Sequence, residues 1–181
     1  MSYFFTKRFL KNPSLVGSMV PSSSFLIEKI LSNIDFSKDL MILEFGPGDG
    51  NFTKQILAKM TPNSKIICFE LDEELFKICK NINDNRLQVY QESAENITNK
   101  ITQKVDTIVS SLPFGSMDIY TVESILTNSY NLLKKDGLFL QYQYFLSNKK
   151  NFTKVFDKVD LDFEVLNIPP AFIYKCQKHE N

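Results

Sequence analysis

Three glycines on alternate positions follow a short apolar run that contains an acid. The run Met41–Phe45 includes Glu44 and leads into Gly46, Gly48 and Gly50, after which apolar residues recur at helical spacing. This pattern predicts a strand, a glycine turn and a helix. Glycine adopts positive φ without steric cost and lets a ligand approach the backbone more closely than a side chain permits. We therefore expect a ligand of nucleoside size at this turn, with a tight structural connection as the alternative.

A second acid ends the next predicted strand. Residues 66–71 are apolar except for Glu70, which lies twenty positions after Gly50. A carboxylate at this place can accept hydrogen bonds from both hydroxyls of a ribose. The glycine spacing is G-x-G-x-G, and the first strand ends in an acid with no basic group beside it to hold a pyrophosphate. The pattern therefore argues against a dinucleotide, and Glu44 can instead meet an ammonium group.

A proline loop follows the fourth predicted strand. Val105–Ser110 runs directly into Ser111, Leu112, Pro113 and Phe114. Such a sequence exposes backbone carbonyls at the carboxyl end of the strand, beside the crevice where open α/β sheets bind ligands. We expect these carbonyls to be available to a ligand in that crevice. The alternative is a structural loop that ends in proline and buries its phenylalanine.

Strand-like and helix-like segments alternate from about residue 40 to residue 133. Such alternation implies right-handed crossovers onto a parallel sheet. The predicted strands are Met41–Phe45, 66–71, 87–91 and Val105–Ser110, and the helices begin near Asn51, Glu73 and Ala94, with a longer one over 117–133.

The pattern changes after a predicted turn at residues 135–137. The last two predicted strands are separated only by a break at Pro169 and Pro170, so they must pair antiparallel. The expected elements in this part are a strand over 138–145, a short polar helix over 148–156, and strands over 163–168 and 172–176.

The beginning of the chain is basic and aromatic. Three cations precede the first acid, Glu28. Residues 2–11 predict a short amphipathic helix, and residues 24–33 predict a second helix capped by serine. We expect one domain, with residues 1–34 as a helical leader and residues 40–181 as the core. The three cations are Lys7, Arg8 and Lys11.

The composition is that of a soluble globular domain. The 181 residues are 43% hydrophobic and carry zero formal net charge. No run of eighteen apolar residues and no secretory signal is present, so we expect a cytoplasmic protein. A neutral chain lacks the wide basic face of a general nucleic-acid binder, so nucleic acid is not an expected partner. The spacing of Cys68, Cys79 and Cys176 matches neither a zinc site nor a disulfide frame, so we expect buried thiols and no metal.

A resemblance to a known enzyme family runs along nearly the whole chain. It is carried by residues 8–22, 43–48, 109–113, 141–144 and 167–171. On these segments the chain resembles the small bacterial phospholipid N-methyltransferases, which methylate phosphatidylethanolamine and are related to the ribosomal RNA adenine dimethyltransferases. The glycine turn is common to all class I methyltransferases, whereas the leader and the Pro-Pro ending are more restrictive.

The resemblance implies an α/β, Rossmann-like class I methyltransferase fold. This fold has a mostly parallel seven-stranded sheet, a C-terminal antiparallel hairpin whose last strand lies beside the fifth, and helices on both faces. The implied cofactor is S-adenosylmethionine, with the first acid ordering the turn and the methionine end and the second acid holding the ribose. Ser93 stands where an aspartate commonly binds the adenine amine. The residues expected at the cofactor are Glu44, Gly46, Gly48, Gly50, Glu70, Leu71, Ser93, Ala94 and Ser111.

The implied reaction is N-methylation of the amine headgroup of phosphatidylethanolamine and of its methylated intermediates. Methylases that act on amines place Asn-Leu-Pro-Tyr or a relative in the proline loop. This chain departs from that pattern, because a serine oxygen accepts one hydrogen bond where asparagine both accepts and donates. The residues expected at the acceptor amine are Ser111, Pro113, Phe114 and Tyr144.

The leader gains a function under this resemblance. An amphipathic helix with aromatic residues and cations can lie in the headgroup layer of an anionic membrane. We therefore expect the segment from Met1 to Lys11 to hold the protein at the inner face of the cell membrane, with coverage of the cofactor crevice as the alternative. Rival functions are adenine N-methylation of ribosomal RNA or another nucleic acid, and a catalytically silent module that binds the cofactor. The preferred lipid, the number of methyl groups and the oligomeric state stay open.

Overall fold

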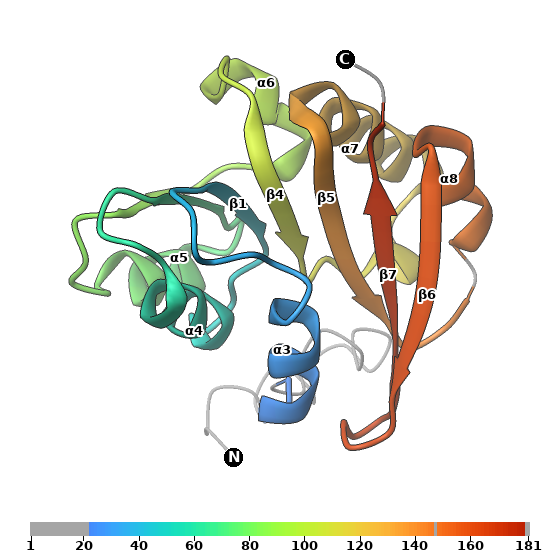
Figure 1. Cartoon of the computed structure of the whole chain (residues 1–181), viewed down its shortest axis with the longest axis horizontal. Coiled ribbons are helices and arrows are strands. Elements are labelled where there is room, and N and C mark those ends of the chain that lie inside the picture. Colours follow the sequence, from blue (N-terminus) through green and yellow to red (C-terminus); the bar gives the residue numbers. More distant parts are fainter. Residues whose placement is uncertain (1–21, 147, 180–181) are drawn as a thin grey trace.

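A seven-stranded sheet forms the centre of the computed structural model, which describes residues 22–146 and 148–179. The strand order is β3-β2-β1-β4-β5-β7-β6. The first five strands pair in parallel, whereas β7 pairs antiparallel with both β5 and β6 (Figure 1). The expected mostly parallel sheet with a final hairpin beside the fifth strand is confirmed. The strands are β1 (Met41–Phe45), β2 (Lys65–Phe69), β3 (Leu87–Tyr90), β4 (Val105–Ser110), β5 (Leu133–Gln143), β6 (Lys158–Glu164) and β7 (Ala171–Gln177).

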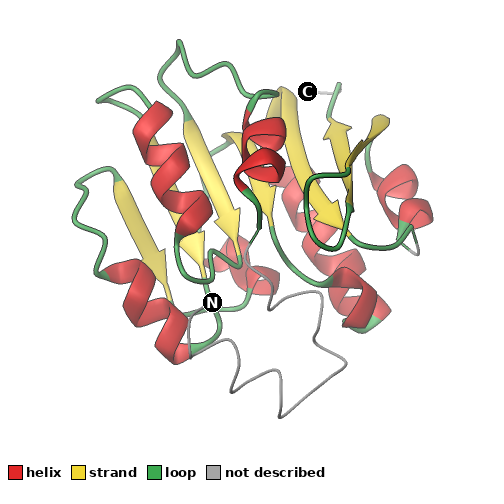
Figure 2. Ribbon diagram, turned by 90° about the horizontal axis from the view of Figure 1, so that it is seen from below, coloured by secondary structure: helices red, strands yellow, loops and turns green. Residues whose placement is uncertain are grey.

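Side chains alternate across the sheet and fill two separate cores. On β1, Leu43 and Phe45 join one core and Ile42 joins the other, because successive residues of a strand point to opposite faces. Figure 2 shows helices on both faces of the sheet, as expected. One core receives side chains from α3 (Ser24–Leu31), α4 (Asn51–Lys59) and α5 (Glu73–Lys80), and the other from α6 (Ile97–Lys100), α7 (Ile119–Leu132) and α8 (Lys149–Val155).

The chain reverses its direction across the sheet at β1. Strands β2 and β3 lie on one side of β1, and β4 and β5 lie on the other. In open α/β sheets, ligands bind outside the carboxyl ends of the strands at such a point. The arrowheads of β4 and β5 mark this end of the sheet at the bottom of Figure 1, near α3. We call the edge formed by the carboxyl ends of β1 to β5 the site edge.

The helix that precedes the sheet begins where the sequence predicts. Ser23 caps α3 by accepting a hydrogen bond from Leu26 N at 3.1 Å. Leu26, Ile27, Ile30 and Leu31 of α3 are buried in the core on one face of the sheet, whereas Phe25 is exposed. The helix expected within residues 2–11 lies outside the described residues. Within the described ranges, no helix combines the length and the hydropathy needed to cross a membrane.

The sixth strand differs from its expected position. β6 covers Lys158–Glu164 rather than residues 163–168, and residues 165–170 form the turn to β7. Charged residues alternate with apolar ones along β6, and most of its side chains are exposed. An outer strand tolerates such a sequence because only one of its edges pairs. Because β6 contains no continuous apolar run, the sequence pattern placed the strand too late, at residues 163–168.

The fifth strand begins earlier than expected. It starts at Leu133, so the predicted turn at 135–137 is an irregularity inside the strand. Asp136 has a φ of 61° and donates its N–H to the Lys178 carbonyl at 2.7 Å, while Lys178 N donates to the Gly137 carbonyl at 3.1 Å. Pairing with the end of the chain keeps this segment in the sheet. The helix expected at Ala94 is short, consisting of a 3-10 turn η2 (Ala94–Asn96) followed by α6.

Candidate functional site

The site residues predicted on three different strands lie side by side at the site edge. Gly46 N donates to the Phe69 carbonyl at 2.9 Å, and Ser111 N donates to the Phe45 carbonyl at 2.9 Å. Glu70 N makes an equivalent bond of 3.1 Å to the last residue of β3. The parallel ladder thus continues past the strand ends and places the glycine turn between the second acid and the proline loop.

All three glycines of the turn have positive φ, as predicted. The φ values of Gly46, Gly48 and Gly50 are 68°, 58° and 77°. A Cβ on Gly46 would lie 3.2 Å from Leu112 Cδ2, and a Cβ on Gly50 would lie 2.8 Å from Ile82 Cδ1. A Cβ on Gly48 would meet no atom within 4 Å. Gly46 and Gly50 are therefore packed against neighbours, whereas Gly48 borders open space that a ligand can occupy.

Glu44 is fully buried two residues before the turn. Its Oε2 accepts hydrogen bonds from Thr53 Oγ1 at 2.7 Å and from Cys68 Sγ at 3.4 Å. Its Oε1 is buried and has no hydrogen-bond partner among the described residues. Burial raises the pKa of Glu44 to about 7, against the opposing effect of the two hydrogen bonds. A buried acceptor without a donor is costly, so Glu44 Oε1 is suited to a donor that a ligand brings.

Glu70 supports the glycine turn. Its Oε2 accepts from Gly48 N at 3.1 Å and its Oε1 accepts from Asp72 N at 3.0 Å. The carboxylate therefore fixes the turn in addition to the ribose contact expected for it. Leu71, the next residue, extends into solvent with 71% of its surface exposed.

Ser93 and Ala94 follow β3 at the same edge of the sheet. Ser93 caps η2, because its Oγ accepts from Glu95 N at 3.3 Å. Ala94 is buried in the core that contains α6 and α7. The hydroxyl of Ser93 is thus used locally, and the cofactor contact expected for this pair stays a prediction.

Two buried glutamines of β5 hold the proline loop. Nε2 of Gln141 and Nε2 of Gln143 each donate to the Leu112 carbonyl at 3.0 Å, and Phe114 N donates to the same oxygen at 2.9 Å. The Leu112 carbonyl is therefore engaged within the protein and is not one of the free carbonyls expected here. Ser111 also lies beside the turn, since a Cβ on Gly46 would lie 3.8 Å from its carbonyl carbon.

The glutamines were missed as site residues by the sequence pattern. In that pattern the two glutamines alternate with Tyr142 and Tyr144, and in the structure the two pairs lie on opposite faces of the strand. The pattern assigned the glutamines no role, although two amides at alternate positions of an interior strand are a signal of buried hydrogen bonding.

Phe114 lies in the core beneath the loop. Only 2% of its surface is exposed, and its ring packs on Phe152 of α8 with the centroids 6.0 Å apart. This packing agrees with the alternative in which the loop buries its phenylalanine. Pro113, the residue before it, is partly exposed.

Two tyrosines from the end of β5 lie on the side of the sheet that carries α4. The ring of Tyr142 stacks on Phe52 with centroids 6.2 Å apart, and its hydroxyl accepts from Ser22 Oγ at 3.1 Å. Burial raises the pKa of Tyr142, and hydrogen bonds to Ser22 and Ser111 oppose that shift. Burial raises the pKa of Tyr144 to about 12. The Tyr144 hydroxyl has no partner within hydrogen-bond distance among the described residues, although Asn167 lies near enough to oppose part of the rise in its pKa.

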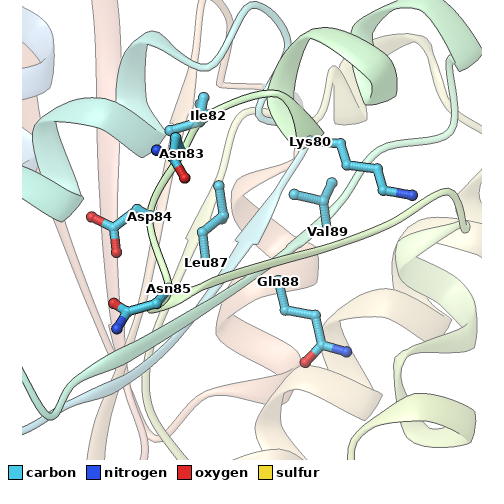
Figure 3. Close-up of a pocket in the computed structure, with 8 residues that line it drawn as sticks. All are labelled: Lys80, Ile82, Asn83, Asp84, Asn85, Leu87, Gln88 and Val89. Carbon is cyan, nitrogen blue, oxygen red and sulfur yellow. The ribbon is translucent and has the colours of Figure 1, made fainter.

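A separate cavity of about 430 Å³ lies along β3 (Figure 3). It is lined by residues of the segment 80–89, such as Lys80, Asp84 and Leu87. None of the predicted site residues lines it, and Leu87 belongs to the amino end of β3. The cavity lies beside the predicted site residues, because Ile82, which also lines it, packs against Gly50 of the glycine turn.

Comparison with known proteins assigns the chain to a family. A family model described as ribosomal RNA adenine dimethylase matches residues 4–115, which is more than half of the chain. The chain belongs to this family. It is a class I S-adenosylmethionine-dependent methyltransferase related to the adenine dimethylases of ribosomal RNA.

Individual relatives differ in how much of their length the chain covers. It is 27% identical to the ornithine lipid N-methyltransferase of Singulisphaera acidiphila, over 97% of this chain and 95% of that protein. It is 28% identical to ribosomal RNA small subunit methyltransferase A of Mycoplasma capricolum, over 70% of this chain and 51% of that protein. Among solved structures, SMU.1697c of Streptococcus mutans in complex with SAH has a TM-score of 0.61 at 17% identity, with 82% of this chain and 94% of that chain covered. That likeness shows the same fold.

The residues of the site edge fit this cofactor. Glu44 Oε1 offers a buried acceptor without a donor, and the cofactor carries an ammonium group at its methionine end. The open space beside Gly48 leaves room for a ligand against the backbone. The buried acceptor and the open space are thus compatible with S-adenosylmethionine.

Proposed function

We propose that the protein transfers methyl groups to the amine of a membrane lipid headgroup, with phosphatidylethanolamine and its methylated intermediates as the first candidates. The observation that carries the proposal is the similarity to an ornithine lipid N-methyltransferase along nearly the full length of both chains. Ornithine lipid and phosphatidylethanolamine share a primary amine. The chemistry common to both is therefore methylation of an amine held at a bilayer surface.

The proposed cofactor contacts come from the turn and the strand ends. Glu44 and the glycines would hold the methionine part, and Glu70 with Leu71 the ribose. Ser93 and Ala94 would lie at the adenine. S-adenosylmethionine supplies an electrophilic methyl group whose departure leaves a neutral sulfide. The protein's task is to position the acceptor and to present its nitrogen without a proton.

The proposed acceptor contacts lie on the other side of the glycine turn. Ser111 lies beside Gly46, and its hydroxyl and carbonyl oxygens are hydrogen-bond acceptors suited to an amine N–H. Tyr144 adds a buried hydroxyl without a partner within hydrogen-bond distance among the described residues. An ammonium group loses its proton more readily in a partly desolvated site, which would favour the nucleophilic amine. Pro113 would shape the loop, and the buried ring of Phe114 would support the loop from the core beneath it.

Membrane attachment is the second part of the proposal. The segment from Met1 to Lys11 carries three cations and several aromatic residues before any acid. Such a segment would hold the enzyme at the inner face of the cell membrane, where its substrate lies.

A second candidate function is adenine N-methylation of ribosomal RNA. The family match and the similarity to ribosomal RNA small subunit methyltransferase A favour it. The chain spans about half the length of that relative. The zero net charge and the serine at position 111 argue for a lipid amine over a nucleic acid.

One labelling experiment separates the candidates. The protein is incubated with methyl-labelled S-adenosylmethionine and, in parallel, with vesicles containing phosphatidylethanolamine, vesicles containing ornithine lipid, and small ribosomal subunits. We expect label in the organic phase with an amine lipid and none with phosphatidylcholine alone. Label only in RNA would overturn the proposal in favour of the second candidate. Cofactor binding without transfer to any acceptor would identify a silent module.

A further inference from the structure

Exposed apolar side chains gather at the site edge beyond β5 and β7. Phe145 and Leu146 follow β5, and Val165, Leu166 and Ile168 lie in the turn between β6 and β7. We call these five residues the apolar rim. Each has 44–82% of its surface exposed, although large apolar residues are normally buried. A cluster of this kind marks an interaction surface more often than a chance exposure.

The strand register brings the two parts of the rim together. Gln143 pairs with Phe172 and Glu164 pairs with Ala171, so the segments after β5 and around the β6–β7 turn leave the sheet at the same end. In Figure 1 the β6–β7 turn projects beyond the ends of the strands. The two parts of the rim therefore lie at the same end of the sheet as the proposed acceptor side of the site.

Polar groups inside the turn hold the rim in place. Asn167 Oδ1 accepts from Ser23 N at 2.9 Å, and its Nδ2 donates to the Pro169 carbonyl at 2.7 Å. Glu164 Oε1 accepts from Leu166 N at 2.8 Å. These bonds satisfy backbone groups of the turn and fasten it to the start of α3. The apolar side chains consequently project from a fixed base.

The charges beside the rim favour an anionic partner. Lys149 and Lys150 are exposed in the first turn of α8, and Lys149 N donates to the Leu146 carbonyl at 3.1 Å. The nearby acid Asp162 is paired with Lys29 at 3.0 Å. Asp118, at the start of α7, is an exposed acid on the same edge. Lys149 and Lys150 form no ion pair among the described residues, whereas Lys29, beside the β6–β7 turn, is balanced by Asp162 and by Glu164 at 3.9 Å.

We propose that the apolar rim inserts into the headgroup region of an anionic bilayer and sets the site edge against the membrane. The inference rests on the proposed lipid function and adds a structured contact to the one assigned to the leader. Aromatic and aliphatic side chains flanked by lysines bind such surfaces through burial and electrostatic attraction. A two-fold pairing of copies through the rim would bring the lysines of both copies together, whereas an anionic bilayer attracts them.

The test compares a triple variant of the rim with a double control variant, both in the full chain. Phe145→Ser, Leu166→Ser and Ile168→Ser together remove apolar surface from the rim. Ile78→Ser with Leu161→Ser removes exposed apolar surface from α5 and the middle of β6, away from the rim. Flotation with vesicles of phosphatidylglycerol and phosphatidylethanolamine measures binding. Calorimetry with the cofactor, and methylation of a short-chain soluble amine lipid, show whether the site is intact.

The rim variant should bind vesicles about tenfold or more weakly than the parent, since three large side chains no longer enter the bilayer. Cofactor affinity and activity on the soluble lipid should stay within about twofold of the parent, and the control variant should float normally. Equal flotation of rim variant and parent would overturn the proposal. So would loss of soluble-lipid activity with normal flotation, or a change from dimer to monomer in the rim variant without a change in flotation.

The proposed lipid function can fail separately. If the parent methylates no lipid but floats through the rim, membrane binding by the rim is supported and the lipid substrate is excluded. If the parent methylates a soluble amine lipid but does not float, membrane binding by the rim is excluded and the substrate class is supported.

Discussion

The side-chain amide of Gln143 donates a hydrogen bond to the backbone carbonyl of Leu112 at 3.0 Å, which ties β5 to the loop after β4. Gln141 bonds the same oxygen, so one acceptor receives two buried donors from alternate positions of one strand. The loop that carries Ser111 is therefore fixed by a neighbouring strand as well as by its own. The position of the proposed acceptor group depends on residues outside the loop.

Replacing both Gln141 and Gln143 with Met should loosen this loop. Met has a similar length but no donor, so the Leu112 carbonyl would lose two bonds at a cost of about 1–3 kcal/mol in unfolding free energy. We expect kcat/KM for the acceptor to fall by about tenfold or more, and the cofactor Kd to change little. Steady-state kinetics, calorimetry and urea unfolding check these outcomes. Gln103→Met, at an exposed amide, is the control; an equal loss of cofactor affinity would contradict the assignment.

The glycines of the turn should respond differently to alanine. Gly50→Ala places a Cβ 2.8 Å from Ile82 Cδ1 and should destabilise the fold by about 1–3 kcal/mol. Gly48→Ala meets no atom within 4 Å, so its cost is only the strain of positive φ, about 1–2 kcal/mol. Gly48→Ala should weaken cofactor binding more than it weakens the fold. Thermal melts and calorimetry separate the two effects; normal cofactor binding by Gly48→Ala would mean that the turn is only structural.

Glu70→Ala should reduce cofactor affinity by about tenfold to a hundredfold, since a charge-assisted hydrogen bond is worth about 1.5–3 kcal/mol. The variant also removes the acceptors for Gly48 N and Asp72 N, so the turn itself should loosen. Glu70→Gln keeps an oxygen acceptor and is the matched comparison. Calorimetry at constant pH measures both. Unchanged affinity in Glu70→Ala would remove Glu70 from the cofactor site.

Glu44 should make the stability of the cofactor-free protein depend on pH. Its pKa of about 7 in the folded state lies above the ordinary value of 4.5, so the folded state holds the proton more tightly than the unfolded chain. The contribution of protonated Glu44 to the free energy of unfolding is fully present below about pH 4.5. It is lost as the pH rises through about 7, a total change of about 3 kcal/mol. Glu44→Gln should flatten that slope. Melting curves from pH 5 to 8 check the effect, and equal slopes in both proteins would contradict it.

The leader should act through charge. Changing Lys7, Arg8 and Lys11 together to Gln should reduce sedimentation with anionic vesicles, and the parent's binding should weaken with salt as the Debye length falls from about 10 Å at 0.1 M to about 3 Å at 1 M. Activity on vesicles should fall more than activity on a soluble lipid, and cofactor affinity should stay nearly constant. If the variant pellets as well as the parent, or loses cofactor binding in parallel, the leader covers the site or the core instead.

The parallel half of the fold could be predicted because its strands and helices have clear periods. β1 and β4 have the bounds that the sequence indicated, and the apolar residues of α4 recur at helical spacing. β6 was predicted too late in the chain because charged residues interrupt its apolar ones, and most of its side chains are exposed. The start of β5 was predicted too late, because the pairing that keeps residues 135–137 in the sheet comes from Lys178, which is distant in the sequence.

The candidate site was predictable where backbone geometry determines the residue type. Positive φ at the glycine turn and an acid at a strand end are visible in the sequence. The bonds from Gln141 and Gln143 depend on how a loop folds over a neighbouring strand, and no local pattern contains that information. The use of Ser93 as a helix cap similarly depends on the short helix that follows it.

The three buried thiols divide between the two layers of the protein. Cys68 and Cys79 lie in the core that contains α3, α4 and α5, and Cys176 lies in the core that contains α6, α7 and α8. A thiol reagent can reach a buried cysteine only when the surrounding layer opens. The labelling rates of these cysteines therefore report separately how often each side of the sheet opens. Mass spectrometry of the labelled peptides would show which layer opens first, and whether the cofactor slows the opening of one layer without the other.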